Sequence, residues 1–299
     1  MTLGVLCSLA PFCPTVAQPT RHPSPDWSAV EQALGRNGAA QPGDVIRFGF
    51  PRSDLQIAAY GVTLKPALAL GSWVAFKQAG TSSIAMGDLV LLEDEVGPVM
   101  RKLEEGGVQQ TALHNHVLTE MPRVMYMHIA AHGQAERIGE AIHSALSLTK
   151  TPLEMPPPAP ATPSAIDLDT ASVTRALGVA GKVNGGVYQV SIPRLERVME
   201  RGMEVPPSMG VATAINFQPT GGGRAAITGD FVMTAGEVNG VIRALTSHGI
   251  AVTALHSHML EERPRLFFMH FWANDDVTAL ATGLRAALDR MNVRKTVVH

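Results

Sequence analysis

Cysteine is almost absent from this sequence. Its 299 residues include only two, Cys7 and Cys13, and both stand in the opening segment. If that segment is removed, the chain has no thiol, which excludes disulfides, thiolate nucleophiles and cysteine-based zinc or iron–sulfur sites. A metal site in this protein would therefore have to use imidazole and oxygen ligands.

An excess of either charge and long apolar runs are also missing. The 24 basic and 26 acidic side chains nearly balance, and no block of Lys or Arg provides the footprint of a nucleic-acid-binding protein. Beyond the opening segment, no run reaches the roughly 18 apolar residues that a membrane-spanning helix requires. With 45% hydrophobic residues, the chain can form a substantial core. We expect a globular protein with a small-molecule or cell-envelope ligand, without nucleic acid or an integral membrane span, and its oligomeric state stays open.

The opening segment has the features of an export signal. Residues 1–17 are largely apolar and end in Thr15-Val16-Ala17, which places small residues before a cleavage point after Ala17. We predict a signal peptide over residues 1–17 and an exported protein that is periplasmic or secreted, with membrane anchoring as a variant. A buried first helix is the alternative interpretation.

The rest of the chain consists of one unit present in two copies. The segment from Thr111 aligns with the segment from Thr253, an offset of 142 residues, and 11 of the first 18 aligned positions are identical. A Pro-rich stretch between the copies favours an extended spacer over a helix. We predict a first repeat domain over residues 26–149, a linker over 150–166 and a second repeat domain over 167–293.

Hydrophobic periodicity predicts the same elements in each copy. An apolar strand at residues 89–92 precedes a short amphipathic helix that ends at Gly106-Gly107. Two strands, over residues 108–118 and 124–130, and a second amphipathic helix complete the copy. We predict an α+β fold, a tandem duplication of a mainly antiparallel sheet unit with helices packed on one face, the two units being related by a pseudo-two-fold axis.

Six of the 11 histidines recur at identical spacing, in the pattern His-x-His-x3-Glu-x-Pro-Arg-x4-His. Side chains two residues apart on a strand point to the same face. If the hairpin pairs Leu118 with Val124, His128 lies directly opposite His114. Three imidazoles in each copy would then share one face: His114, His116 and His128 in the first copy, and His256, His258 and His270 in the second.

Three imidazoles with a nearby carboxylate form a ligand set that suits zinc, and also manganese, iron or copper. We predict that such a transition metal, zinc first, binds at one or both sets. Glu120 and Glu262 follow the paired histidines and would act either as fourth ligands or as catalytic bases. Arg123 and Arg265 are candidates for binding a substrate carboxylate or phosphate, with a salt bridge at the sheet edge as the alternative.

The histidine pattern also has plainer interpretations. Duplication would equally copy a histidine-lined polar core or cleft, or a cluster that senses pH. Asp88 and Asp230 each follow a glycine at the start of a strand, a position typical of a turn. We therefore assign these two aspartates to turns rather than to the site.

The block Ala-Leu-His-x-His-x-Leu-x-Glu-x-Pro-Arg is followed by Met-His and preceded by Gly-Asp and Glu-Val pairs in both copies. Together with the duplication and the export signal, this block resembles the LppY/LpqO family of exported bacterial proteins. The resemblance covers nearly the whole mature chain. It implies export, and lipoproteins occur in the family, but it assigns no biochemical function.

Two functional hypotheses remain open at this point. In a metal-dependent hydrolase, the histidines would hold an ion, an open coordination position would hold water, and the glutamate would take its proton. In a non-catalytic metal- or ligand-binding protein, the same residues would form a closed shell or a histidine-lined pocket. An open shell beside a cleft favours the first hypothesis, and a closed shell favours the second.

Overall fold

The structure is a computed structural model that describes residues 25–154 and 165–294. The predicted signal peptide and most of the predicted linker lie outside the described residues. Within the described part of the chain, no helix is long and apolar enough to cross a membrane.

The first half of the chain forms one six-stranded antiparallel sheet in the order β1-β2-β5-β6-β8-β7. A two-stranded β3-β4 pair and four helices accompany it. Its elements are α1 (Ser28–Leu34), β1 (Ala39–Gln41), β2 (Val45–Pro51), β3 (Ala58–Ala59), β4 (Val62–Thr63), α2 (Pro66–Ala69), β5 (Gly71–Ala79), β6 (Ser82–Leu92), α3 (Glu93–Glu105), β7 (Gln109–His114), β8 (Val124–Gly133) and α4 (Ala135–Leu146).

The second half repeats this topology. Its six-stranded sheet has the order β9-β10-β13-β14-β16-β15, which matches the first sheet strand for strand. The predicted tandem duplication of an α+β unit is therefore confirmed. Its elements are α5 (Thr170–Leu177), β9 (Lys182–Asn184), β10 (Val187–Pro193), β11 (Val198–Glu200), β12 (Met203–Val205), η1 (Pro207–Met209), β13 (Ala212–Gly221), β14 (Arg224–Thr234), α6 (Ala235–Thr246), β15 (Ala251–His256), β16 (Leu266–Asp276) and α7 (Val277–Leu288).

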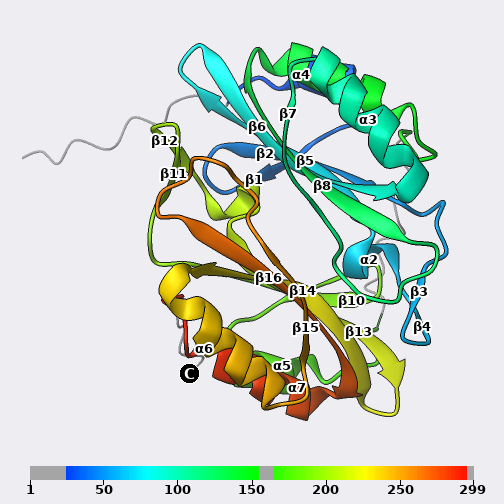
Figure 1. Cartoon of the computed structure of the whole chain (residues 1–299), viewed down its shortest axis with the longest axis vertical. Helices are drawn as coiled ribbons and strands as arrows, with labels where there is room; N and C mark the ends of the chain where they lie inside the picture. Colours follow the sequence, from blue (N-terminus) through cyan, green and yellow to red (C-terminus); the bar gives the residue numbers. More distant parts are fainter. Residues whose placement is uncertain (1–24, 155–164, 295–299) are drawn as a thin grey trace, which may run out of the picture.

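The two sheets face each other in the middle of the molecule, and the helices cover their outer faces (Figure 1). One apolar core lies between each sheet and its own helices. Two further cores combine residues of both halves, as when Val45 and Ile84 pack with Val232 and Phe268. Because each sheet is covered on both faces, the central strands β6 and β14 are buried along most of their length. The second face of each sheet is thus covered by the other half, as the duplication predicts.

A buried ion pair joins strand and helix at equivalent places in the two halves. Arg52, fully buried, donates to the carbonyl oxygen of Val90 and to the carboxylate of Glu95, both at 2.7 Å. Glu95 also caps the first turn of α3. Arg194 and Glu237 make the same contact in the second half, at 2.7 Å. The contact explains why Arg52 and Glu95 of the first copy have their counterparts, Arg194 and Glu237, in the second copy.

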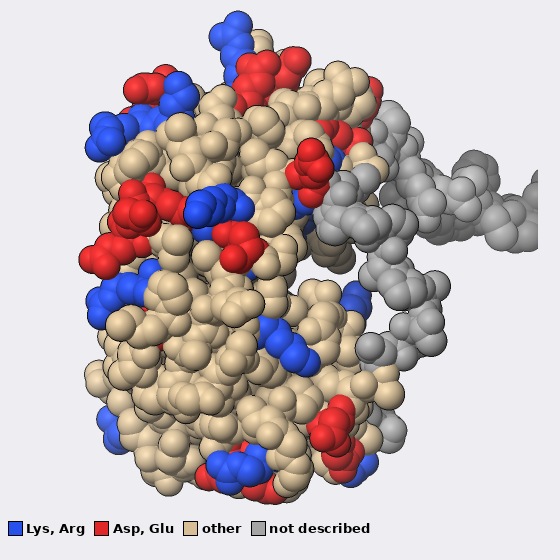
Figure 2. Space-filling view, turned by 90° about the vertical axis from the view of Figure 1, so that its right-hand side faces the viewer, with Lys and Arg blue, Asp and Glu red and all other residues tan. Residues whose placement is uncertain are grey.

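The surface carries charges of both signs. On the face shown in Figure 2, Lys and Arg lie interspersed with Asp and Glu, and neither sign forms a large continuous patch. This distribution agrees with the near balance of charge in the sequence.

The predicted register of the histidine hairpin is wrong. Strand β7 ends at His114, which pairs with Tyr126, whereas His128 pairs with Ala112, which borders a bulge between Gln110 and Ala112. The strand ends early because residues 115–123 leave the sheet and turn toward the other half. The register differs from the predicted one by two residues, so His114 and His128 still share a face.

Candidate metal centre

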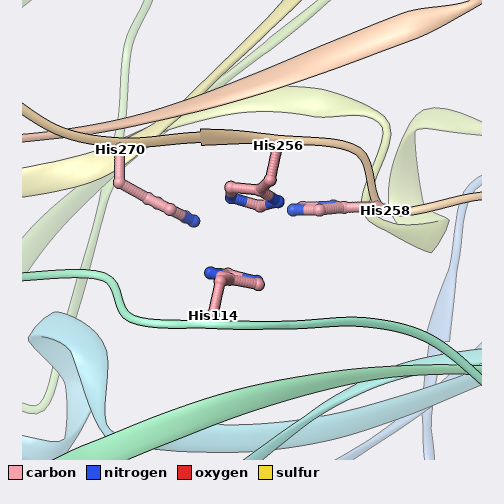
Figure 3. Close-up of side chains that lie close together, drawn as sticks. All are labelled: His114, His256, His258 and His270. Atoms are coloured by element: carbon pink, nitrogen blue, oxygen red, sulfur yellow. The ribbon is translucent and has the colours of Figure 1, made fainter.

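The histidines of both copies meet between the two sheets. The side chains of His256 and His270 project from β15 and β16, His258 follows β15, and His114 reaches them from β7 (Figure 3). One nitrogen of each of these four rings lies within 4.8 Å of a nitrogen of every other. This arrangement is a group of imidazoles that could hold a metal ion.

The remaining two histidines belong to the same cluster. The rings of His114 and His256 stack with centroids 3.6 Å apart. The rings of His116 and His270 contact each other in a tilted arrangement with centroids 3.9 Å apart, and those of His128 and His258 stack at 3.5 Å. Each of these three contacts joins one half to the other. The sequence predicts one histidine set per copy, but the structure brings both sets into a single cluster, which we call the six-histidine centre.

Two symmetric hydrogen bonds hold the halves together beside this centre. The hydroxyl of Thr111 donates to the carbonyl oxygen of His258 at 2.6 Å, and the hydroxyl of Thr253 donates to that of His116 at 2.5 Å. Strands β7 and β15, the edge strands of the two sheets, also contact each other here. These bonds follow the pseudo-two-fold relation, since Thr111 and Thr253 are equivalent positions of the duplication.

Two aspartates complete the centre. Oδ2 and Oδ1 of Asp88 lie 3.8 and 3.9 Å from Nε2 of His116 and His128, and Oδ2 of Asp230 lies 3.3 Å from Nε2 of His258. None of these contacts is a hydrogen bond in the structure. The separations approach the roughly 3.3 Å between ligand atoms that surround a tetrahedral zinc ion at about 2.0–2.1 Å.

The assignment of these aspartates to turns is therefore wrong. Asp88 lies within β6 and Asp230 within β14, directly beside the third histidine of each set. The preceding glycines serve close packing, because a Cβ on Gly87 would lie 2.7 Å from the carbonyl oxygen of Trp73 and one on Gly229 would overlap the backbone of β13. The Gly-Asp pair recurs at the 142-residue offset of the duplication, and this recurrence is the feature of the sequence that could have identified both aspartates.

The polar atoms of the centre are buried and lack partners. Among the described residues, Nε2 of all six histidines and Oδ1 of both aspartates have no hydrogen-bond partner. Buried polar groups in native proteins are nearly always paired, because an unpaired one keeps its full desolvation penalty. Several such atoms lie in one place, and those of four histidines come close enough together that they could hold a metal ion.

Backbone carbonyls orient two of the rings. Nδ1 of His270 lies 2.8 Å from the carbonyl oxygen of Gly229, and Nδ1 of His114 lies 3.2 Å from that of Asn115. A carbonyl oxygen can only accept, so Nδ1 carries the proton in both rings and Nε2 keeps its lone pair for a ligand bond. Metal-binding histidines commonly have such a partner behind them.

Burial keeps the imidazoles neutral. It lowers the pKa of His114 to about 4 and that of His256 to about 3, and it lowers the pKa of the other four well below the ordinary value. Burial also raises the pKa of Asp88 to about 7, against the opposing charge of Arg47. The pKa of Asp230 is raised by burial and by the charge of Asp88. Neutral imidazole is the form that binds metal, and an ion would displace protons from these carboxyls.

The predicted glutamates hold the hairpin connections instead. Oε1 of Glu262 accepts from the backbone N–H of Leu266 at 2.9 Å, and Oε2 lies 3.2 Å from the guanidinium of Arg265. Glu120 is buried at the equivalent place, and burial raises the pKa of its carboxyl. Neither glutamate belongs to the group of ligand atoms that come together. The carboxylates that lie beside the histidines are those of Asp88 and Asp230, whereas Glu262 is bonded within the turn that follows the histidines. The roles predicted for the two glutamates stay predictions.

The two predicted arginines lie away from the imidazoles. Arg265 donates to the carbonyl oxygen of Leu260 at 3.1 Å and so belongs to the hairpin connection. Arg123 lines an open surface hollow together with Pro122, Glu93 and Asp94. Substrate binding by these arginines stays a prediction.

The two sheets cover most of the six histidines. His114, His128, His258 and His270 are buried, whereas His116 and His256 keep part of their surface exposed. Two hollows of the described part of the chain are lined by residues other than these histidines. The centre is therefore largely covered by the two halves of the chain.

The family described as Domain of Unknown Function (DUF1259) matches residues 28–148 and again residues 171–290. The chain belongs to this family. Each match covers one copy of the duplication, including its aspartate and its three histidines of the centre. No curated protein matches the chain.

Two solved structures have a low similarity to the chain. A trimeric bacterial microcompartment shell protein, PduB, is 11% identical, with 84% of this chain and 90% of that chain covered and a TM-score of 0.20. EtuB from Clostridium kluyveri is 10% identical, with 84% and 88% covered and a TM-score of 0.20. At this TM-score the likeness supports no conclusion on fold or function.

Proposed function

We propose that this protein binds a transition metal at the six-histidine centre and that both halves of the chain supply the ligands. The observation that carries this proposal is the set of buried imidazole Nε2 atoms, contributed by both halves, that have no partner among the described residues. A histidine-lined polar core would instead satisfy these atoms through hydrogen bonds.

The donor set favours zinc, with manganese, iron and copper as the other candidates. Imidazole suits zinc, copper and iron, and carboxylate suits manganese. Six imidazoles and two carboxylates exceed the four ligands of one tetrahedral ion and are enough for two. Thus the centre has a capacity of up to two ions per chain.

Between the two hypotheses, the geometry favours the non-catalytic binding protein over the hydrolase. A hydrolase needs a substrate path to an open coordination position. The centre lies between two covered sheets, and Glu262, a candidate base, is bonded to the hairpin backbone. We further propose, from residues 1–17 and the resemblance to LppY/LpqO proteins, that metal binding takes place in the periplasm or outside the cell.

Elemental analysis of the full chain, purified without an affinity tag, tests the proposal. We expect one or two equivalents of a first-row transition metal per chain. Because the halves share one centre, His258→Ala should lower the metal content by more than half, whereas independent sites would lose only one of two ions. His132→Ala is the matched control, since His132 is exposed and outside the cluster.

Two results together would contradict the proposal. One is the absence of metal from the purified protein, and the other is an unchanged melting temperature on addition of zinc, manganese, iron or copper. Binding to the native state alone raises stability by about 2.7 kcal/mol at a ligand concentration of one hundred times Kd, so a metal site would be visible in this assay.

A further inference from the structure

The two halves of the centre differ at one aromatic position. The ring of Tyr126 stacks on His116 with centroids 3.3 Å apart and an interplanar angle of 7°. At the equivalent position of the second half, Phe268 stacks on His258 at 3.5 Å and 15°. Both rings are buried and make the same contact with a histidine of the centre. The aromatic ring therefore serves packing in both halves, and only the hydroxyl of Tyr126 is additional.

Packing does not explain this hydroxyl. Tyr126 is 1% exposed, and its hydroxyl has no hydrogen-bond partner among the described residues. Its surroundings include the apolar side chains of Ile57, Val90 and Val117, and burial raises the pKa of the hydroxyl, with a smaller effect of the charges of Asp88 and Glu120. A phenylalanine would fill this space without burying an unpaired polar group, as Phe268 does in the second half. None of the described residues supplies a hydrogen-bond partner for this hydroxyl, so it is available to a bound ligand.

The position of Tyr126 places it among the ligands. It lies on the same face of β8 as His128, two residues away, and pairs across the sheet with His114, whose ring centroid is 6.1 Å from its own. With His116 stacked on it, Tyr126 is in contact with or next to all three histidines of the first half. The nitrogens that come together are those of His114 and of the three second-half histidines, and His114 is the cross-strand neighbour of Tyr126. A ligand that approaches the ion from the side of His114 would therefore lie near the tyrosine, whereas the second half offers only the apolar Phe268 at the equivalent position.

We infer that the hydroxyl of Tyr126 donates a hydrogen bond to a small oxygen or nitrogen ligand, such as water, hydroxide or a small anion, bound to the metal on the first-half side of the centre. This inference rests on the proposed function. It makes the centre asymmetric, because only one half can hold an exogenous ligand by this bond. Burial of most of the centre favours a ligand of only a few atoms.

Azide binding to the cobalt-loaded protein tests this inference. Co²⁺ takes the ligands of zinc, and the visible spectrum reports an added anion. We expect Tyr126→Phe to keep the cobalt content of the wild type and to bind azide about tenfold more weakly or worse, the usual effect of losing a hydrogen bond to a charged ligand. The double variant Tyr126→Phe/Phe268→Tyr, which moves the hydroxyl to the other half, should regain affinity.

The outcomes separate this inference from the proposed function. If the wild type takes up no cobalt, the metal centre itself is refuted and this inference falls with it. If cobalt binds but azide does not, or if azide binds Tyr126→Phe as tightly as the wild type, the metal centre stands and the role of Tyr126 is refuted. A merely structural role would change the melting temperature and leave the azide affinity per bound cobalt unchanged.

Discussion

Acid should destabilise the metal-free protein, because burial keeps the histidines of the centre neutral. The pKa of His114 is lowered to about 4 and that of His256 to about 3. The unfolded chain therefore binds protons that the folded chain excludes as the pH falls below the ordinary value, 6.5. The contribution of these histidines to stability is fully present above that pH and is lost as the pH falls toward 4.

The two aspartates act in the opposite direction. The pKa of Asp88 is raised to about 7, and that of Asp230 is also raised. Over the same pH range, the contribution of these two aspartates to folding stability is present at low pH and is lost as the pH rises. Six imidazoles outnumber two carboxyls, so the net effect has the sign of the histidines. A net difference of one proton between the two states changes stability by about 1.4 kcal/mol per pH unit, which is a large change in a total of about 5–15 kcal/mol.

Urea unfolding of the chelator-treated protein between about pH 7 and 5 measures this effect. We expect the free energy of unfolding to fall with pH, and the double variant His114→Gln/His256→Gln to show a smaller slope. His132→Ala should reduce the slope much less than this double variant, because His132 is exposed and its partial burial lowers its pKa less strongly. A free energy of unfolding that stays constant or rises toward acid would refute the assignment of neutral, buried histidines.

Two further predictions concern residues around the centre. Glu262→Gln should keep the full metal content and lower stability by about 1 kcal/mol, because its carboxylate accepts a hydrogen bond from Leu266 in the connection; loss of metal in this variant would show that Glu262 is a ligand. Arg52→Ala should cost about 3–5 kcal/mol in urea unfolding, because it leaves a buried carboxylate unpaired. Lys102→Ala, which removes an exposed ion pair of similar length, is its control and should have little effect. Equal effects of the two variants would contradict the structural role of the buried pair.

The fold could be predicted because its signals are local and occur twice. The amphipathic period of α4 and α7, the glycines that end α3, and the repeat at an offset of 142 residues each indicate one element or one relation. The packing of the sheets also follows from the pattern, since a sheet with helices on one face requires cover on the other. Agreement between two copies supports each of these predictions.

The site was harder to predict because its geometry depends on contacts between the halves. The repeat identified the six histidines, but no local pattern shows that His128 of one copy stacks on His258 of the other. Asp88 was missed because a glycine before it is typical of a turn, whereas here the glycine allows close packing of strands. The hairpin register was missed because the strand ends where Thr253 of the other half binds the backbone of His116. Such long-range contacts leave no periodicity in the sequence.

Anomalous diffraction from crystals of the metal-loaded protein, recorded at the absorption edge of the metal, tests the central claim most directly. The account predicts one or two peaks between the two sheets, within about 2.0–2.2 Å of histidine nitrogens or aspartate oxygens, with ligands from both halves of the chain. Peaks only at the protein surface, or a peak whose ligands all come from one half, would contradict a centre that the two copies build together.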